Sequence, residues 1–449
     1  MRRSLPSGLA PMGSRNYALF WVGYLFSNTG RWIELTGSVW LVYLLTDSPI
    51  LLGLLGIVRA VPSVVLSPIA GVIADRVDQR RLLFVTQALG FGASLALGLL
   101  VATGLVELWH VYVQVAAQAA ITAFDQSTRQ ALFPRLVPRT QLPAAVTLSA
   151  TAARLATLAG PAIGGVAIAS LGEASPFLLN AASLTVLVVA LVAMTGIAPQ
   201  PRGVGGGFRR ELAEGLRYIL RAPVLNGLIR MEVFFSIFSM NAVLITIVGV
   251  EILGVGPEGL GWLLAAPAVG SLVGIAGLVS LGHARRPGRL VVISTLIYAV
   301  AMIGFAVSTS YMVSFAILAV TGLIDAVVTI TRHALVQLAA PGEMRGRVMA
   351  NMGVVTRGLS PLAQTQSGLM AGILGAPLAG ATAAIVLAVM AAATGYFNRS
   401  LWKFSLAEAI EDPDEDPDED GEPGPGREVA ATAGSAPGTG ASEPRPPSR

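Results

Sequence analysis

Long apolar segments without charge are the feature that most constrains the fold of this chain. Hydrophobic residues make up 54% and charged residues only 12% of its 449 residues, whereas soluble globular proteins carry about 25% charged residues. A bilayer core about 30 Å thick needs roughly 20 apolar residues per helix, while a barrel strand needs only about 10 alternating ones. The segments here match the longer length, so the sequence predicts an all-α integral membrane protein.

Short polar breaks divide the apolar sequence into twelve predicted transmembrane helices. Their expected starts are Tyr17, Leu51, Leu82, Trp109, Leu142, Pro176, Pro223, Gly259, Leu290, Met312, Val348 and Pro377. After the sixth helix, the segment "FRRELAEGLRYILRAP" places Leu212, Leu216 and Ile219 on one helical face and charges on the other. This pattern predicts an amphipathic helix that lies on the inner membrane surface.

These features divide the chain into four predicted regions. Residues 1–200 form a first six-helix half, and residues 223–403 form a second. Residues 201–222 form a central cytoplasmic loop that contains the amphipathic helix. Residues 404–449 form a disordered tail, because a segment rich in acidic residues, proline and glycine cannot bury a core.

Arginines concentrate in every second segment between the predicted helices. Arg76, Arg80 and Arg81 follow the second helix, and Arg129 and Arg135 are expected around the turn between the fourth and fifth helices. The alternate segments, such as "TDSP" and "GEAS", contain no lysine or arginine. Because loops rich in lysine and arginine stay in the cytoplasm, both termini are predicted to be cytoplasmic. The expected location is the inner membrane of a bacterial cell.

The two predicted halves resemble each other in sequence. The segment "TRQALFPRLVP" begins at Thr128 and "TRHALVQLAAP" begins at Thr331, a shift of 203 residues. The same shift pairs Arg154 with Arg357, two arginines inside predicted helices. A parallel repeat of six helices, related by an axis along the membrane normal, is typical of one large class of transporters.

The composition excludes most enzyme chemistry. The chain has no cysteine, which excludes disulfides and thiolate metal sites. Its single lysine, Lys403, follows the last apolar segment, so no phosphate-binding lysine of an ATPase is present. The three histidines are scattered and form no metal-ligand spacing. We therefore expect no enzyme, no cofactor, no metal site, no nucleic-acid partner and no ATPase subunit.

Charged residues inside the predicted helices are the candidates for mechanism, because each costs at least about 2.5–3.5 kcal/mol at the bilayer centre. Glu34 lies near the middle of the first helix, three residues after Arg31, so the two can pair on one helical face. Asp325 lies near the middle of the tenth helix and Glu232 nearer the cytoplasmic end of the seventh. Burial raises the pKa of a carboxyl group and a nearby arginine lowers it, so these three carboxyl groups are the candidates for proton coupling. A structural ion pair remains the alternative for each.

Other polar residues in the helices have two possible roles. Arg59, Arg154 and Arg357 are candidate charge partners of the carboxylates or gating residues. Gln114, Gln118 and Asn241 are candidates for lining a substrate cavity. Polar side chains also hold membrane helices together, so a structural role stays open for all of these residues.

Two motifs resemble signatures of the major facilitator superfamily. "GVIADRVDQRR" resembles its loop signature Gly-x-x-x-Asp-Arg-x-Gly-Arg-Arg, with Asp78 at the second glycine and with matches at Gly71, Asp75, Arg76, Arg80 and Arg81. "AGPAIGG" in the fifth helix resembles the core of the antiporter motif, whose upstream glycines are replaced here and whose matches are Gly160, Pro161, Gly164 and Gly165. The region of residues 15–400 resembles the branch that contains enterobactin exporters and macrolide efflux pumps, the transmembrane secretion effectors.

This resemblance implies a major facilitator fold with two six-helix halves that rock about a central cavity. It implies that the loop signature forms a cytoplasmic gate, in which Gly71 lets the second and eleventh helices approach, and that the antiporter motif supports export. The expected function is a secondary exporter of drugs or siderophore-like metabolites by proton antiport. Its partners are the lipid bilayer and a small amphipathic substrate, and its energy source is the proton gradient. The alternatives are an importer or facilitator of the same fold, and a lipid flippase or scaffold.

Overall fold

The computed structural model describes residues 7–195, 208–281 and 286–404, and this part of the chain is helical with no β-strand. The predicted acidic tail lies outside the described residues from residue 405 onward. The first six long helices are α1 (Arg15–Thr46), α2 (Pro49–Arg76), α3 (Gln79–Ala102), α4 (Leu108–Leu132), α5 (Leu142–Leu171) and α6 (Ser175–Ala193). We call these helices the first bundle.

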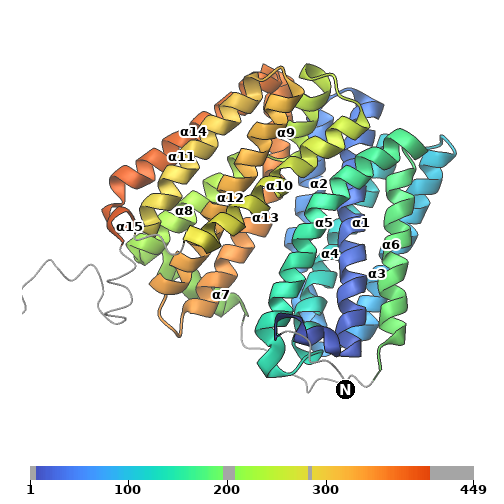
Figure 1. The fold of residues 1–449 in the computed structure, drawn as a ribbon, viewed down its shortest axis with the longest axis horizontal. Helices are drawn as coiled ribbons and strands as arrows, with labels where there is room; N and C mark the ends of the chain where they lie inside the picture. The colour runs from blue at the N-terminus through green and yellow to red at the C-terminus, as the bar shows by residue number, and fades with distance from the viewer. Residues whose placement is uncertain (1–6, 196–207, 282–285, 405–449) are drawn as a thin grey trace, which may run out of the picture.

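The remaining helices follow the central segment. They are α7 (Phe208–Arg221), α8 (Pro223–Phe238), α9 (Ala242–Ile247), α10 (Pro257–Leu281), α11 (Pro287–Val307), α12 (Tyr311–Ala339), α13 (Arg345–Leu374), α14 (Ala376–Phe397) and α15 (Arg399–Lys403). A π-helical turn, Val248–Ile252, continues α9. We call α8 to α14 the second bundle. Figure 1 shows the two bundles side by side, with α7 below the second.

Each predicted helix start lies within three residues of an observed one. Within the described ranges, nine helical segments are long and apolar enough to cross a membrane. Helices α1, α4 and α13 are as long but are not among the nine, because they carry more polar side chains. The count of twelve spans therefore stays a prediction.

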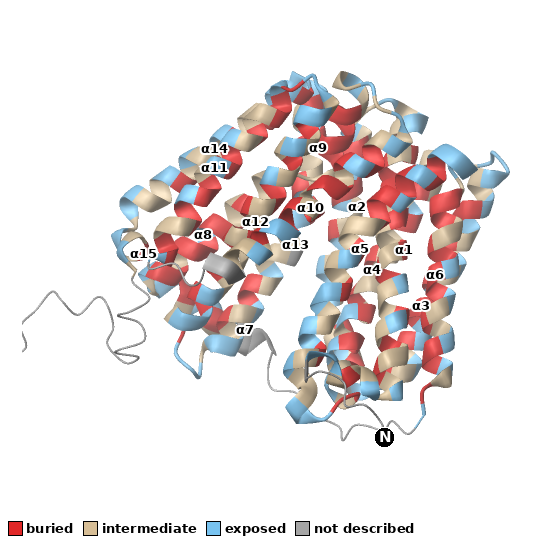
Figure 2. Cartoon of the chain, viewed as in Figure 1, coloured by how far each residue is buried: buried red, intermediate tan, exposed pale blue. Residues whose placement is uncertain are grey.

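Apolar side chains form the interior of each bundle and also cover its outside. Buried apolar residues form three clusters. One lies in the second bundle, one at the end where the two bundles meet, and one around the N-terminal end of α1. Figure 2 shows buried residues inside the bundles and exposed ones on their outer faces. Large apolar residues such as Val65, Leu89 and Ile385 are exposed on those faces. A lipid environment explains this exposure, because the lipid core is itself apolar.

The two bundles meet at one end of the molecule through glycines. A Cβ atom added at Gly53 of α2 would lie 2.7 Å from the Cα atom of Gly368 in α13. A Cβ atom added at Gly165 of α5 would lie 2.8 Å from the Cα atom of Gly261 in α10. Small residues at both pairs thus let the backbones touch. Toward the N-terminal end and α7, the ribbons of the bundles diverge (Figure 1).

Gly71 does not lie at a helix contact in this structure, contrary to the prediction. A Cβ atom added there would meet nothing within 4 Å. The contact between α2 and α13 lies in the first half of α2, at Gly53 and Gly56. Gly71 is near the other end of the same helix, where the bundles diverge. The packing in this conformation therefore does not require a glycine at this position.

The predicted amphipathic helix is present as α7, and it packs on protein. Ile219 is buried in the core of the second bundle, whereas Leu216 is exposed. Glu214 forms an ion pair of 2.8 Å with Arg347 of α13. The side chain of Leu212 lies outside the described residues. Helix α7 is therefore attached to the core of the second bundle through Ile219, and to α13 through the ion pair of Glu214 with Arg347.

Candidate functional site

Glu34 of α1 is enclosed by neutral hydrogen-bond donors. Its side chain is only 5% exposed. Its carboxylate accepts hydrogen bonds from the Ser94 hydroxyl (2.7 Å), the Gln114 amide (3.0 Å), the Gln118 amide (3.3 Å) and the Asn180 amide. These donors come from α3, α4 and α6. Among the described residues, no arginine or lysine forms an ion pair with Glu34.

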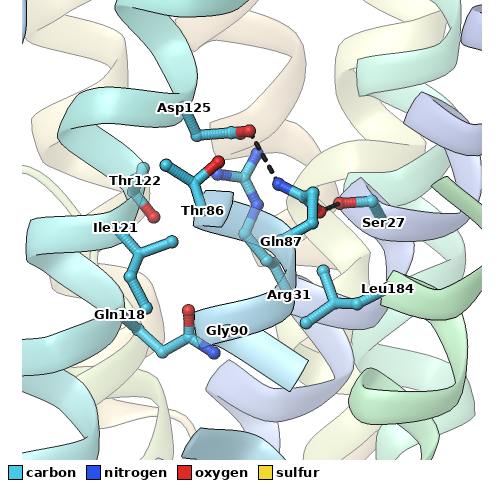
Figure 3. Close-up of a pocket in the computed structure, with 10 residues that line it drawn as sticks. All are labelled: Ser27, Arg31, Thr86, Gln87, Gly90, Gln118, Ile121, Thr122, Asp125 and Leu184. Carbon is cyan, nitrogen blue, oxygen red and sulfur yellow. Dashed lines mark hydrogen bonds between the residues drawn. The ribbon is translucent and has the colours of Figure 1, made fainter. Parts of the chain in front are cut away.

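The predicted pairing of Arg31 with Glu34 is wrong. The Arg31 Nη2 atom donates to the Asn28 Oδ1 atom at 2.7 Å. Figure 3 shows the Arg31 guanidinium group extending toward Asp125. Side chains on a helix lean toward its N-terminus, and Glu34 lies on the C-terminal side of Arg31. The arginine therefore extends away from the carboxylate that the spacing suggested as its partner.

A second polar cluster in the first bundle forms a closed ring of hydrogen bonds. Arg129 forms an ion pair of 2.7 Å with Asp125, and its Nη2 atom donates to the Ser27 hydroxyl at 3.3 Å. Ser27 donates to the Gln87 carbonyl at 3.1 Å, and the Gln87 amide donates to Asp125 at 2.7 Å. The Arg129 guanidinium carbon also lies 4.7 Å from the centre of the Tyr24 ring. This ring connects α1, α3 and α4.

Arg129 lies in the last turn of α4, beside the turn around which it was expected, and its side chain is buried in the bundle, at 8% exposure. The sequence carried a signal for this role, because Asp125 and Arg129 in "FDQSTRQ" are four residues apart, the spacing of neighbours on one helical face. Ser27, Gln87, Ser94 and Asn180 had no such signal, because their partners lie on other helices.

A small pocket lies between the two clusters (Figure 3). Its volume is about 10 Å³, which is enough for about one water molecule. It is lined by Ser27, Arg31, Thr86, Gln87, Gly90, Gln118, Ile121, Thr122, Asp125 and Leu184. Gln118 is the one lining residue that also donates to Glu34.

Glu232 belongs to a separate cluster in the second bundle. Glu232 of α8 forms an ion pair with Arg332 of α12, and the two side chains are 2% and 3% exposed. Glu232 also accepts hydrogen bonds from the hydroxyl groups of Thr356 in α13 (2.6 Å) and Ser236 (3.1 Å). The Arg332 guanidinium carbon lies 5.7 Å from the centre of the Phe235 ring. The cluster ties α8, α12 and α13 together.

Among the described side chains, Asp325, Arg59 and Arg154 form no direct bond to these clusters. Asp325 is partly buried, and the Thr329 hydroxyl donates to its carboxylate at 3.3 Å. Arg154 and Arg332 lie within electrostatic reach of Asp325, and Arg59 lies within reach of Glu34. The side chain of Arg357 lies outside the described residues. The structure thus separates Glu34, Asp325 and Glu232 into three different surroundings.

Asn241 is a helix cap at a break in the predicted seventh span. Helix α8 ends at Phe238 and α9 begins at Ala242, and the Asn241 side chain accepts from the backbone N–H groups of Val243 (3.1 Å) and Leu244 (3.2 Å). Its amide donates to the Ser367 hydroxyl of α13 at 2.8 Å. These bonds satisfy the N–H groups that a new helix leaves open, so Asn241 holds the break against α13.

The loop signature "GVIADRVDQRR" ties helices together within the first bundle. Asp78 caps α3 by accepting from the backbone N–H groups of Arg80 (2.8 Å) and Arg81 (3.1 Å). The Arg80 guanidinium donates to the backbone carbonyls of Leu191 (2.7 Å) and Val192 (2.9 Å), at the end of α6. Arg76 and Arg81 are exposed, and the side chain of Asp75 lies outside the described residues.

The antiporter-like motif in α5 lies at two helix contacts. A Cβ atom added at Gly160 would lie 3.0 Å from the Thr29 carbonyl oxygen, and one added at Gly164 would lie 3.1 Å from the Ile33 carbonyl oxygen, both in α1. Gly165 and the carbonyl of Pro161 face Gly261 of α10. The motif therefore packs α5 against the turn of α1 just before Glu34 and against the second bundle.

Known proteins similar to this chain are membrane transporters. A family model described as "Transmembrane secretion effector" matches residues 6–415. The uncharacterized MFS-type transporter YfiS of Bacillus subtilis is 26% identical over 372 residues, which are 79% of this chain and 86% of that protein. The enterobactin exporter EntS of Shigella boydii is 27% identical over 325 residues, which are 70% of this chain and 73% of that protein.

Solved structures of other transporters share the fold. An inward-facing, unoccupied bacterial homologue of the human lysosomal transporter Spinster superimposes with a TM-score of 0.66 at 14% identity, covering 86% of this chain and 97% of that one. A POT family transporter gives 0.69 at 13% identity, covering 87% and 97%. The nucleoside transporter NupG gives 0.67 at 11% identity, covering 87% and 100%.

Proposed function

Because this chain belongs to the transmembrane secretion effector family of MFS-type transporters, we propose that it exports small molecules by proton antiport. As a member of that family it is a multi-pass integral membrane transporter and not an enzyme. The proposal adds the direction of transport, the driving ion and the kind of substrate.

The proposed transporter has twelve spans in two six-helix halves, residues 1–200 and 223–403, joined by the cytoplasmic loop 201–222. Both termini are cytoplasmic, and the membrane is the inner membrane of a bacterium. Two features support this arrangement: the agreement of the helix starts with the apolar segments, and the absence of lysine and arginine from every second loop.

The observation that carries proton coupling is the set of neutral partners around Glu34. An ionised carboxylate is satisfied there by one hydroxyl and three amide donors. A protonated carboxyl group needs an acceptor, and each amide has a carbonyl oxygen that can turn toward it. Glu232 differs because one of its partners is the guanidinium group of Arg332, which has no acceptor and stabilises the ionised carboxylate. Glu34 can therefore exchange a proton while staying hydrogen-bonded.

Alternating access would require the two bundles to rock. In this structure they touch at the glycine pairs Gly53–Gly368 and Gly165–Gly261, and they diverge at the other end. Transport would separate these glycines and bring the ends of α2 and α13 near the loop signature together. In the proposed mechanism, Gly71 and Asp75 act at that second contact, in the conformation opposite to this one.

The proposed substrates are small amphipathic molecules of the siderophore or drug type. The relative EntS is named an enterobactin exporter. This name supports export as the direction of transport and makes enterobactin the first compound to test. Asp325 is the second candidate for proton coupling, because it is partly buried and its only hydrogen bond to a described residue is the weak one from Thr329.

Efflux measurements test the proposal. Cells that lack their own efflux pumps would express the wild type or Glu34→Gln and be loaded with enterobactin, ethidium or a macrolide, with and without a protonophore. We expect the wild type to lower the accumulation of at least one compound only when the gradient is present. Glu34→Gln should remove this dependence, because glutamine cannot carry the proton.

The control substitution is Glu173→Gln, which makes the same change at an exposed residue between α5 and α6. It should leave efflux unchanged. The proposal fails if no compound shows gradient-dependent efflux in the wild type. Proton coupling at Glu34 fails if Glu34→Gln keeps the full dependence.

A further inference from the structure

We propose that the transported molecule carries a negatively charged group and that Arg154 of α5 binds this group on the face of α5 that lies toward the second bundle. This inference rests on the proposed export function and names the chemical class of its substrate, an amphipathic oxyanion such as a carboxylate. It also assigns a binding role to a residue for which the sequence suggested only a charge partner or a gate.

Arg154 lies on the face of α5 that contacts the second bundle. A Cβ atom added at Gly261 of α10 would lie 2.5 Å from the carbonyl oxygen of Pro161 in α5. Arg154 comes seven residues before Pro161, which is about two helical turns and about 10 Å along the helix axis. It therefore stands on the same face as that contact, displaced toward the end where the bundles diverge (Figure 1).

This face of α5 is polar and becomes more exposed with distance from the contact. Pro161 is buried, Arg154 is half-buried, and Thr151 and Thr147 are exposed. Thr147 comes fourteen residues before Pro161, so it continues the same face. Exposed residues on the outer faces of the bundles, such as Leu89, are apolar. Because ionisable residues in membrane helices face the protein interior or water rather than lipid, we expect this polar face to line the substrate path.

The second bundle presents Asp325 at about the same depth as Arg154. Gly322 of α12 lies against the carbonyl of Pro267 in α10. Pro267 comes six residues after Gly261, and Asp325 comes three residues after Gly322, so Asp325 lies about 13 Å from the Gly261 contact along the helix axes. Arg154 and Asp325 lie within electrostatic reach of each other, yet no ion pair joins them in the described part of the chain.

The charge of Arg154 is not compensated by a bonded partner. No ion pair between described residues includes Arg154, Arg31 or Arg59, whereas Arg129 and Arg332 each have a carboxylate partner. A guanidinium group is always charged, and a charge within the membrane is costly to keep. The first bundle thus keeps three guanidinium groups without a carboxylate bonded to them, and a negatively charged substrate would provide the missing charge.

Arg154 is the best placed of the three arginines to bind a substrate. Arg31 is held by Asn28 within the first bundle, and Arg59 lies within reach of Glu34. Arg154 faces the second bundle, and its planar group can bind a carboxylate through two parallel N–H···O hydrogen bonds. Asp325 is then the carboxylate of this chain that competes with the substrate for Arg154.

Equilibrium dialysis of the full-length protein in lipid nanodiscs tests the site without a proton gradient. The probes are 1-naphthaleneacetate and 1-naphthaleneacetamide, which have nearly the same shape and differ in charge. Binding to nanodiscs without protein is subtracted. We expect the wild type to bind the carboxylate about 10- to 100-fold more tightly than the amide, the ratio that corresponds to a hydrogen bond with a charged group.

Arg154→Gln should lower the affinity for the carboxylate to that for the amide and leave the affinity for the amide unchanged. Arg154→Lys keeps the charge but loses the planar group, so it should keep part of the preference. Asp325→Asn removes the competing carboxylate and should tighten the binding of the carboxylate probe. Arg154→Gln should also keep the thermal unfolding temperature of the wild type, because it breaks no bond to a described residue.

The matched control is Arg139→Gln, which makes the same change at an exposed residue just before α5 and should leave both affinities unchanged. Equal binding of the two probes by the wild type would refute an oxyanion site. Full preference in Arg154→Gln, or loss of the preference in Arg139→Gln, would refute the assignment to Arg154.

A structural role of Arg154 has a different signature. It would lower the unfolding temperature of Arg154→Gln and weaken the binding of both probes alike, and this result would also overturn the proposal. Because the dialysis uses no gradient and no cells, it can succeed where the efflux measurements fail. In that case the export function would be wrong and the anion site would stand.

Discussion

The two buried arginines Arg129 and Arg332 stand at equivalent positions of the two bundles, 203 residues apart, yet they are held in different ways. Arg129 pairs with Asp125 of its own helix, and neutral side chains complete the links to α1 and α3. Arg332 pairs with Glu232 of another helix, so the ion pair itself ties α12 to α8.

This difference makes the links between helices easier to rearrange in one bundle than in the other. Neutral hydrogen-bonding groups can rotate and exchange partners at small cost, because a typical hydrogen bond contributes only about 1 kcal/mol. A buried ion pair cannot be separated so easily, since each charge would be left without compensation. The links between helices around Arg129 are therefore the more adaptable ones, because they pass through neutral side chains, whereas the link between α12 and α8 is the ion pair itself.

The two arginines also share one feature. The Nε and Nη1 atoms of both have no hydrogen-bond partner among the described residues. Each guanidinium group lies over an aromatic ring, that of Tyr24 or Phe235. The aromatic faces provide part of the missing stabilisation. The difference between the two sites therefore comes from the position of the carboxylate partner, because the two arginines themselves are held alike.

The largest effect is expected for Glu232→Gln. This change leaves Arg332 buried without its counter-charge and should lower the free energy of unfolding by about 3–5 kcal/mol. Thermal unfolding of the purified protein in detergent measures the loss. The double substitution Glu232→Gln with Arg332→Met removes both charges and should recover most of the stability. A loss below about 1 kcal/mol for Glu232→Gln would show that the ion pair does not hold the second bundle.

Asp125→Asn should have a smaller effect on stability. Asparagine can still accept from Gln87, and Arg129 keeps Ser27 and the Tyr24 ring, so we expect a loss of about 1–3 kcal/mol. The same unfolding measurement gives the number, and it should stay below that of Glu232→Gln. If Asp125→Asn lowered the stability more than Glu232→Gln does, the first bundle would be the rigid one and the second the adaptable one.

The smallest effect is expected for Glu214→Gln. Its ion pair with Arg347 resembles the buried ones in geometry, but the two side chains are 33% and 39% exposed. Exposed pairs contribute about 0.2–1 kcal/mol and are weakened by salt. Unfolding at low and high salt should show a small difference from the wild type that disappears at high salt. A loss of stability that is independent of salt and as large as that of Asp125→Asn would mean that burial does not explain why these ion pairs contribute differently to stability.

The helices could be predicted from the sequence, because the bilayer sets the length of an apolar segment. The predicted starts Leu142 and Pro223 coincide with the starts of α5 and α8, and the others differ by at most three residues. The repeat also marked the positions of Arg129 and Arg332 in both bundles. These features depend on local composition or on similarity within the chain.

The partners of the charged residues could not be predicted in the same way. Ser94, Gln114 and Asn180 lie 60, 80 and 146 residues from Glu34 in the chain. The three-residue spacing of Arg31 and Glu34 suggested an ion pair that the direction of the Arg31 side chain prevents. Gly71 was expected at a contact that lies instead at Gly53, because the contact depends on the conformation of the two bundles.

The sequence by itself determined that this chain is a multi-span helical membrane protein and which family it resembles, because hydrophobic length and short motifs are properties of contiguous residues. Only the tertiary structure decided which carboxylate lies among neutral donors, which are bound to an arginine, and where a water-sized pocket lies. These features arise where three or four helices meet, and the residues of such a meeting point are distant in the chain.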